Sequence, residues 1–257
     1  MKNKFCPYFI LIISLLGFKF AVAQTDTISI DKLRTESGVD PTRVNSRIGY
    51  SILYYDKSDN ITSVSNKLNL NIGVNRWSFS IKPQTITIHN GVKGTGFNTG
   101  FADLNFSILN AFYVKRKNSI AGSVEFNLPF GEPGFGSQYF SATPAITYAY
   151  TISNSLFFAI QPQYTFAIAR DELYPDLRVL TIRNFIAKFT KTGVFCVLEP
   201  RTIFDLENNN FDIILSPIIG KSIGEGFNLI GLMEIPTKQS TIDASGVLYQ
   251  IGFNKNF

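Results

Sequence analysis

The stretch from Gly96 to Ala169 decides the fold, and it reads GFNTGFADLNFSILNAFYVKRKNSIAGSVEFNLPFGEPGFGSQYFSATPAITYAYTISNSLFFAIQPQYTFAIA. Apolar and polar residues alternate through most of it, and turn residues divide it into four similar pieces. In the last piece Phe158 and Tyr164 share one parity, whereas Gln161 has the other. A period of two residues is typical of β-strands with one apolar and one polar or small face. These strands would be about ten to thirteen residues long, whereas ordinary strands have about five or six.

Long alternating strands predict an all-β fold, a transmembrane antiparallel up-and-down β-barrel of about 12 strands. We expect the strands at residues 44–56, 63–74, 77–88, 99–113, 119–130, 139–152, 155–168, 178–189, 193–204, 210–219, 227–235 and 245–257. The number is even, as in bacterial single-chain barrels, and the connections tend to alternate between short and long. The stretch from Gly220 to Gly226 breaks this rhythm as an expected loop, so ten or fourteen strands stay open. The alternation is also broken near Arg183, where a β-bulge would explain it.

The N-terminus has the features of a secretory signal peptide. Lys2 and Lys4 give a positive start, Phe9 to Phe18 is apolar, and Ala21-Val22-Ala23 is a small-residue cleavage pattern. An N-terminal membrane anchor is the alternative, but the apolar run is short. We therefore expect a signal peptide at 1–24, a periplasmic N-terminal arm at 25–43 and the outer-membrane barrel at 44–257. The polar composition of the arm favours disorder over a plug that folds back into the barrel.

Composition narrows the class further. The signal peptide contains three lysines and no acidic residue, so its removal lowers the net charge from +5 to +2 and leaves no case for nucleic-acid binding. Cys196 is then the one remaining cysteine, which excludes an internal disulfide. No later apolar run approaches the length of a membrane-spanning helix. The 24 Phe and 11 Tyr residues suit aromatic girdles at two membrane interfaces. We expect a location in the outer membrane of a Gram-negative cell, with outer-membrane lipids as partners.

Ten charged residues share the inward parity of the expected strands. A charge on the lipid face would cost about 2–4 kcal/mol at mid-depth, so these side chains should line the lumen. Hairpin register would place Lys82 diagonal to Asp103, and Arg201 diagonal to Asp212. The set is balanced in sign, which argues against strong ion selectivity, and it fits either a lumen filled by salt bridges or a narrow pore. The lumen-lining candidates are Arg47, Lys67, Lys82, Asp103, Glu125, Arg183, Glu199, Arg201, Asp212 and Glu234.

The chain ends on Phe257, which shares the outward parity of Val247, Tyr249 and Ile251. A closing strand with an aromatic C-terminus resembles the signal that outer-membrane assembly machinery recognises. This predicts that machinery as a partner, bound through Phe257.

The segments GFADLNF from Gly100, NLPFGEPGFGSQ from Asn127 and ATPAITYAYTIS from Ala142 form a pattern. It resembles a family of Gram-negative outer-membrane proteins named for a role in the meta-cleavage pathway of phenol degradation. The resemblance implies an outer-membrane barrel with a transport role, and its name does not by itself imply a phenolic substrate. The matching residues are Gly100, Asp103, Leu104, Leu128, Pro129, Gly131, Gly134, Gly136 and Pro144.

Within this pattern we single out an outer-loop motif made of Pro129, Gly131, Gly134 and Gly136. Proline is suited to the end of a strand because it cannot donate to the ladder, and glycines permit a tight loop. Loop geometry therefore explains the motif more simply than a ligand site does.

A hydrolase is the enzyme alternative, because outer-membrane phospholipases are also twelve-stranded barrels with a histidine at the outer rim. His89 is the single histidine, but no partner serine can be placed beside it from the sequence. One histidine and one lipid-facing cysteine make a zinc site implausible, and the Gly-rich run from Gly94 to Gly100 lacks dinucleotide spacing. We expect no catalytic, cofactor or metal site. The favoured interpretation is a channel or transporter for a small molecule, and a plugged structural or interaction barrel is the main alternative.

Overall fold

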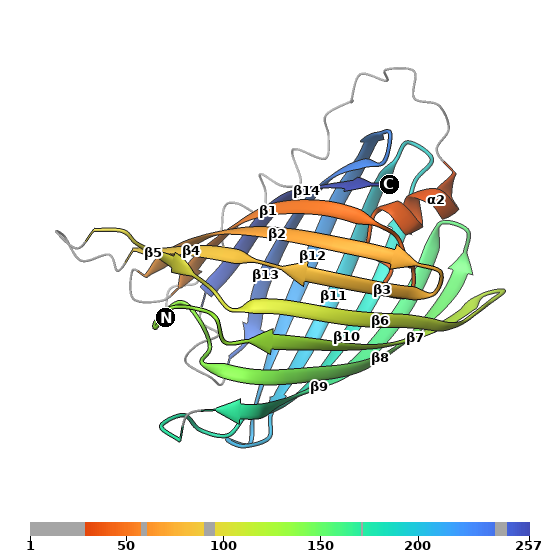
Figure 1. The fold of residues 1–257 in the computed structure, drawn as a ribbon. Helices are drawn as coiled ribbons and strands as arrows, with labels where there is room; N and C mark the ends of the chain where they lie inside the picture. Colours follow the sequence, from red (N-terminus) through yellow and green to blue (C-terminus); the bar gives the residue numbers. More distant parts are fainter. Residues whose placement is uncertain (1–28, 58–60, 90–95, 171, 240–245) are drawn as a thin grey trace, which may run out of the picture.

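The computed structural model describes residues 29–57, 61–89, 96–170, 172–239 and 246–257. These residues form a single sheet with one short helix packed at its end (Figure 1). The helix and strands are α2 (Ile30–Glu36), β1 (Arg47–Lys57), β2 (Thr62–Val74), β3 (Trp77–Lys82), β4 (Gln84–His89), β5 (Asn98–Phe101), β6 (Leu104–Lys115), β7 (Asn118–Leu128), β8 (Tyr139–Ser153), β9 (Leu156–Arg170), β10 (Arg178–Phe189), β11 (Val194–Asp205), β12 (Asn210–Gly224), β13 (Phe227–Lys238) and β14 (Gly246–Asn256).

The sheet closes on itself, because β1 pairs antiparallel with β14 on one side and with β2 on the other. Pro83, which has no N–H to donate, separates β3 from β4, and both pair with β2 in one continuous register. In the same way, β5 pairs with β4 and β6 pairs with β3, so that β5 and β6 together act as one strand of the barrel. The fourteen strand segments therefore build a closed antiparallel barrel of 12 strands. This confirms the predicted fold class.

The two ends of the barrel differ. Short turns, such as Asn75-Arg76 between β2 and β3, lie at the end that carries the C-terminus and α2 (Figure 1). The expected loop at Gly220–Gly226 is wrong, because β12 continues to Gly224 and β13 starts at Phe227. A positive φ of 48° at Glu225, between two glycines that also have positive φ, makes this tight turn possible. The two-residue turns after β2, β6, β8 and β12 thus all lie at one end, which is the periplasmic end in barrels of this kind.

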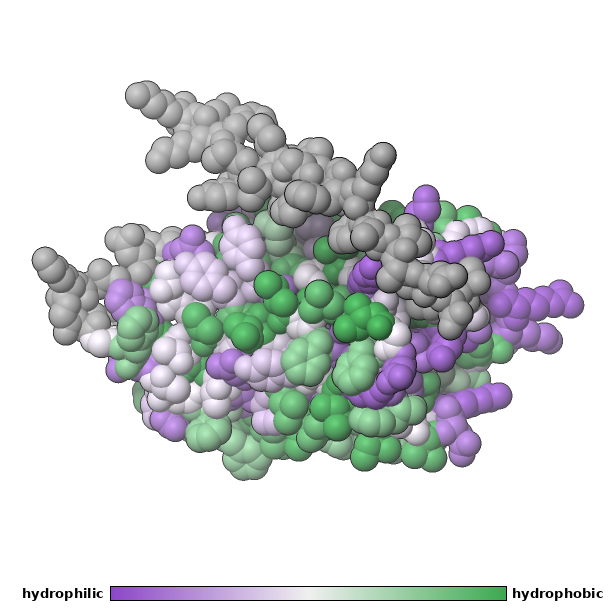
Figure 2. All heavy atoms as spheres, turned by 90° about the horizontal axis from the view of Figure 1, so that it is seen from above, coloured by the Kyte–Doolittle hydropathy of each residue, from purple (hydrophilic) through white to green (hydrophobic). Residues whose placement is uncertain are grey.

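The outer face of the barrel is apolar along its middle. Ile146 and Ile251 are each more than half exposed there. Stacked Trp77 and Phe79 lie near the short turns, and the ring pair of Tyr54 with Tyr249 lies towards the other end. Figure 2 shows hydrophobic side chains gathered along the barrel wall and hydrophilic ones concentrated at the right-hand end. A water-exposed surface of this kind would be unstable, whereas an outward apolar band with aromatic girdles suits a bilayer.

The inner face explains the broken alternation of β10. Phe185 and Phe189 point inward, so large apolar residues stand on the parity that is polar elsewhere. The register of β10 against β9 and β11 runs without a shift through Arg183, so the expected β-bulge is wrong. Bulge-like register shifts occur instead in other hairpins, including β6 with β7 and β12 with β13.

Within the described ranges, no helix is long and apolar enough to cross a membrane. The signal peptide expected at 1–24 lies outside the described residues.

Candidate functional site: the barrel lumen

An ion network crosses the inner wall of β10, β11 and β13. Glu199 is buried and lies 2.7 Å from Nε of Arg183 and 3.2 Å from Nε of Arg201. Arg201 also contacts Glu234 at 2.6 Å and donates a hydrogen bond to Ser216. Each carboxylate here is held by arginine, so these charges largely neutralise one another across the wall.

Hydrogen-bonded amide and hydroxyl groups extend this network to β9 and β8. Arg183 donates to Gln161 Oε1 at 3.3 Å, and the Gln161 amide donates to Thr147 Oγ1 at 2.8 Å. Gln161 has the small-or-polar parity expected from the sequence, but neither it nor Thr147 stood among the lumen candidates, because that set contained only charged residues.

On the opposite wall, Lys82 of β3 forms an ion pair with Glu125 of β7. The sequence predicted different partners, since it placed Lys82 diagonal to Asp103 and Arg201 diagonal to Asp212. The structure pairs Lys82 with Glu125, and Arg201 with Glu199 and Glu234. The alternation does place Glu199 and Arg201 side by side on the inner face of β11. A strand-by-strand register cannot predict the other two pairs, because Lys82 and Arg201 each reach past an intervening strand to Glu125 and Glu234. Asp212 is buried on β12.

Arg47 and Lys67 lie on β1 and β2 and line an internal cavity. Among the described residues neither forms an ion pair, and the Nε atom of Arg47 is buried without a hydrogen-bond partner. An ideal Cβ on Gly38 would stand 1.4 Å from Nη1 of Arg47, so the missing side chain of this glycine makes room for the guanidinium.

Asp103 has a different role from the other lumen candidates, because it anchors the outer loop that follows β7. Its carboxylate accepts hydrogen bonds from the backbone N–H of Gly131 at 3.1 Å and of Ser137 at 2.7 Å. The Ser137 hydroxyl and the Asn127 amide also donate to it. Burial opposes ionisation of Asp103, but these hydrogen bonds outweigh it and hold its pKa below the ordinary value of 3.8.

The outer-loop motif is explained by this anchor. A Cβ on Gly136 would lie 2.3 Å from Asp103 Oδ1, and one on Gly131 would lie 2.7 Å from the Cα of Gly136. Gly134 has a φ of 88°, which favours glycine, and Pro129 directly follows the end of β7. Gly100 touches the loop as well, since a Cβ there would lie 2.4 Å from the Phe135 ring. Residues that carry the family resemblance and lie about thirty positions apart in the sequence thus meet around Asp103, in what we call the loop assembly.

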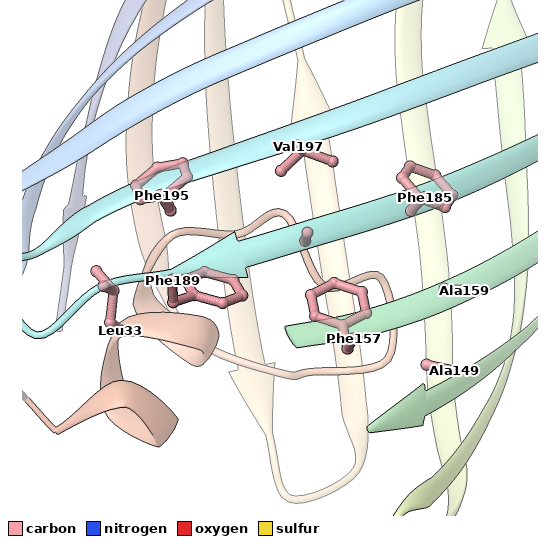
Figure 3. Packing of buried hydrophobic residues seen from close by; sticks show 9 residues of the cluster. Leu33, Ala149, Phe157, Ala159, Phe185, Phe189, Phe195 and Val197 are labelled. Atoms are coloured by element: carbon pink, nitrogen blue, oxygen red, sulfur yellow. The ribbon is translucent and has the colours of Figure 1, made fainter. Parts of the chain in front are cut away.

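The N-terminal segment closes on the short-turn end of the barrel. Leu33 of α2 is fully buried against Phe157, Phe189 and Phe195, which point inward from β9, β10 and β11 (Figure 3). The expectation of a disordered arm is therefore wrong for residues 29–43, and the plug alternative describes them better. The boundaries proposed for the signal peptide and the arm stay predictions.

Polar contacts fix the same segment to the barrel. Arg34 lies 2.5 Å from Asp40, and the side chains of both are almost fully buried. The Arg34 guanidinium also donates to Thr151 and lies 4.3 Å from the centre of the Phe157 ring. Asn228 and Asn256 donate to the carbonyl of Glu36. One signal of this helix is the spacing of Ile30 and Leu33, which puts both on one helical face. A seven-residue element is too short for that signal to stand out.

His89 is the last residue of β4, with its ring against Phe97 and its Cα opposite Thr62 of β2. Cys196 is exposed on the outer face of β11. Across the described ranges there is no group of three or more His, Cys, Asp or Glu residues placed to hold a metal ion.

The barrel is similar to solved outer-membrane proteins. With the NanC porin it shares a TM-score of 0.63 at 11% identity, over 82% of this chain and 100% of the porin. With the KdgM porin, solved in complex with disordered oligogalacturonate, the TM-score is 0.60 at 10% identity, over 82% and 99%. With an outer-membrane channel from Pseudomonas putida F1 it is 0.63 at 8% identity, over 83% and 96%. No protein-family model and no curated protein matches the sequence.

These identities are low, so the likeness establishes the fold and nothing finer. The shared fold, the apolar outer band and the enclosed polar lumen together define an outer-membrane β-barrel of porin-like architecture. The solved neighbours are porins and channels rather than enzymes.

Proposed function

We propose that this barrel is a channel or transporter that lets a small polar molecule cross the outer membrane. The observation that supports it best is the lumen, in which charged and amide side chains occupy both walls and line an internal cavity beside the apolar cluster around Leu33. A barrel that served only as an anchor could fill this space with apolar residues, at no cost in buried charge. The porin-like fold is consistent with this function.

In this proposal the N-terminal segment closes the periplasmic mouth in the resting state. Leu33, Arg34 and Asp40 are buried in that mouth, and α2 contacts the inner wall near β10. Passage would require the segment to move aside. A plugged barrel with a structural or interaction role is the second candidate, and the same burial is the observation in its favour.

Planar-bilayer recordings of the mature protein would separate the two functions. The Leu33→Asp variant places a charge in the aromatic cluster and should expel α2, because an unpaired buried carboxylate is costly. We expect intermittent current from the wild type and larger, steadier current from this variant. Lys32→Asp is the matched control, because Lys32 is exposed on the same helix and its removal should leave the current unchanged. If neither the wild type nor Leu33→Asp conducts above the lipid baseline, the channel is excluded and the plugged barrel is favoured.

Four further points belong to this proposal. The resemblance to the family named for phenol degradation rests on the loop assembly around Asp103, and no substrate follows from it. Phe257 is 77% exposed beyond the end of β14, a position from which assembly machinery could bind it. The apolar outer band is the surface that outer-membrane lipids would cover. The lipid-hydrolase alternative based on His89 predicts that His89→Ala abolishes phospholipid hydrolysis; unchanged hydrolysis, or none in the wild type, removes it.

A further inference from the structure

A cavity of about 260 Å³ lies inside the barrel, between the wall of β1, β2, β3, β12, β13 and β14 and the N-terminal segment. This is room for several water molecules or one small organic molecule. The polar and charged side chains around it are Ser37, Arg47, Ser51, Lys67, Asn69, Lys82, Gln250 and Asn254.

The charge around this cavity is positive, although the ten lumen candidates are balanced in sign. Glu199 on the far wall is held by Arg183 and Arg201, Glu234 of β13 is held by Arg201, and Asp103 is held by the outer loop. Three cations line the cavity and, of these, Lys82 has Glu125 as a carboxylate partner. The selectivity of the lumen therefore depends on which charges are paired, and a count of signs along the strands misses this.

Lys67 is the centre of this unbalanced charge. Within the described part of the chain it forms no ion pair, although the carboxylates of Glu125 and Glu234 lie near enough to act on its charge. Its pairing partner on β1 is Ser51, a small residue. Buried cations are normally paired or hydrogen-bonded, because burial of an uncompensated charge is unfavourable. The Oδ1 atom of Asn69, two residues along β2, is also buried without a partner.

We propose that this cavity binds a small organic carboxylate that carries hydroxyl groups, with the carboxylate at Lys67 and the hydroxyls at the amide side chains of Asn69, Gln250 and Asn254. The inference rests on the proposed function, because it names the class of molecule that the channel would carry. Amides suit hydroxyl groups because they can both donate and accept. Arg47 extends the positive potential towards the N-terminal segment, where its guanidinium lies against Gly38.

The chain segment at Ser37, Gly38 and Val39 forms part of the cavity wall. A bound acid would thus contact the part of the protein that closes the periplasmic mouth. This places the binding site immediately before the barrier that a permeating molecule has to pass.

Isothermal titration calorimetry of the mature protein in detergent tests this site without any need for permeation. Glucuronate is the probe, and glucose, which has the same ring without the carboxylate, is the control ligand. We expect glucuronate to bind and glucose to bind at least about tenfold more weakly, as expected when a charge-assisted hydrogen bond is lost. Lys67→Gln should weaken glucuronate binding by about tenfold or more, and Lys67→Arg should retain it.

The matched control is Lys57→Gln, which removes the same charge at the exposed outer end of β1. Heat-modifiable migration in gel electrophoresis verifies that each variant still forms a barrel. Equal binding of glucose and glucuronate, no glucuronate binding at all, or an unaffected Lys67→Gln variant would each overturn the carboxylate site. If the barrel conducts but gives any of these binding results, the carboxylate site is excluded and the proposed channel is retained. If the barrel binds glucuronate but does not conduct, the channel is excluded and the binding site is retained.

Discussion

Asp103 illustrates, at the scale of a single residue, how position in the fold changes the role of a charge. Its parity places it with the lumen residues, yet the register changes by one residue between the pairs Lys82–Asn105 and Thr85–Phe101. This extra residue, in the break between β5 and β6, lets the carboxylate turn to the loop after β7. A pattern of alternation predicts the face of a residue, but it cannot predict an irregularity of this kind.

The first prediction concerns Asp103→Asn. An amide cannot accept the backbone N–H groups of both Gly131 and Ser137 as strongly as a carboxylate, so we expect the outer loop to lose about 1–3 kcal/mol of docking free energy. Limited proteolysis within residues 129–138 on intact cells or proteoliposomes should become faster. Glu132→Gln, which changes an exposed side chain of the same loop, should leave the rate unchanged.

The same contact gives a pH dependence with a defined sign. The folded-state pKa of Asp103 is below 3.8, so the ionised form stabilises the docked loop above that ordinary value. This contribution is lost as the pH falls through the lower folded pKa. We expect loop proteolysis by an acid-active protease to accelerate only in strong acid, and to be insensitive to pH between 5 and 8. Acceleration already near pH 6 would show that another group controls the loop.

At the scale of elements, the strands were largely predictable because each one repeats a simple pattern over many residues. The helix α2 and the inward aromatic residues of β10 were not predictable in this way. The inward Phe189 of β10 is explained by the helix that packs beside it, and a seven-residue helix is stable only through such packing. Each therefore depends on a contact between distant segments, and the sequence of either segment alone does not contain it.

Replacing Arg34 with alanine tests whether packing and pairing hold α2 in place. The change removes the partner of the buried Asp40 carboxylate at 2.5 Å and the contact with Phe157, and it leaves Arg43 at 3.8 Å as the nearest cation. Breaking a buried pair by removing one partner costs about 3–5 kcal/mol, which exceeds what a seven-residue helix can supply by itself. We expect hydrogen exchange at the backbone amides of residues 30–36 to become much faster, with no change in the barrel strands.

The control lies on the same helix. Lys32 pairs with Glu36 at 3.6 Å, and the Lys32 side chain is 65% exposed. An exposed pair of this kind contributes about 0–1 kcal/mol, so Lys32→Ala should barely change the exchange. Slow exchange in Arg34→Ala would mean that the aromatic cluster around Leu33 holds the segment without the ion pair.

At the scale of the whole molecule, the barrel separates two surfaces that alternate residue by residue along every strand. Ile146 and Thr147 are neighbours in the middle of β8, yet Ile146 is 53% exposed on the outer face and Thr147 is 1% exposed inside. The sequence predicted this division for most strands, because the alternation depends on backbone geometry alone. It could not predict pairs such as Lys82 with Glu125, since those partners reach across an intervening strand.

The membrane position of the barrel gives the last prediction, which concerns arginine substitutions on the outer face of β8. Ile146 lies midway along the strand, whereas Ile152 lies next to the short turn that leads to β9. An arginine on the lipid face costs about 2–4 kcal/mol at the bilayer midplane and about 0–1 kcal/mol near the interface. Equilibrium unfolding from phosphatidylcholine vesicles in denaturant should therefore show a loss of about 2–4 kcal/mol for Ile146→Arg and less than about 1 kcal/mol for Ile152→Arg. Equal losses at the two positions would contradict a bilayer around this face, because only the depth in hydrocarbon distinguishes two outward isoleucines of the same strand.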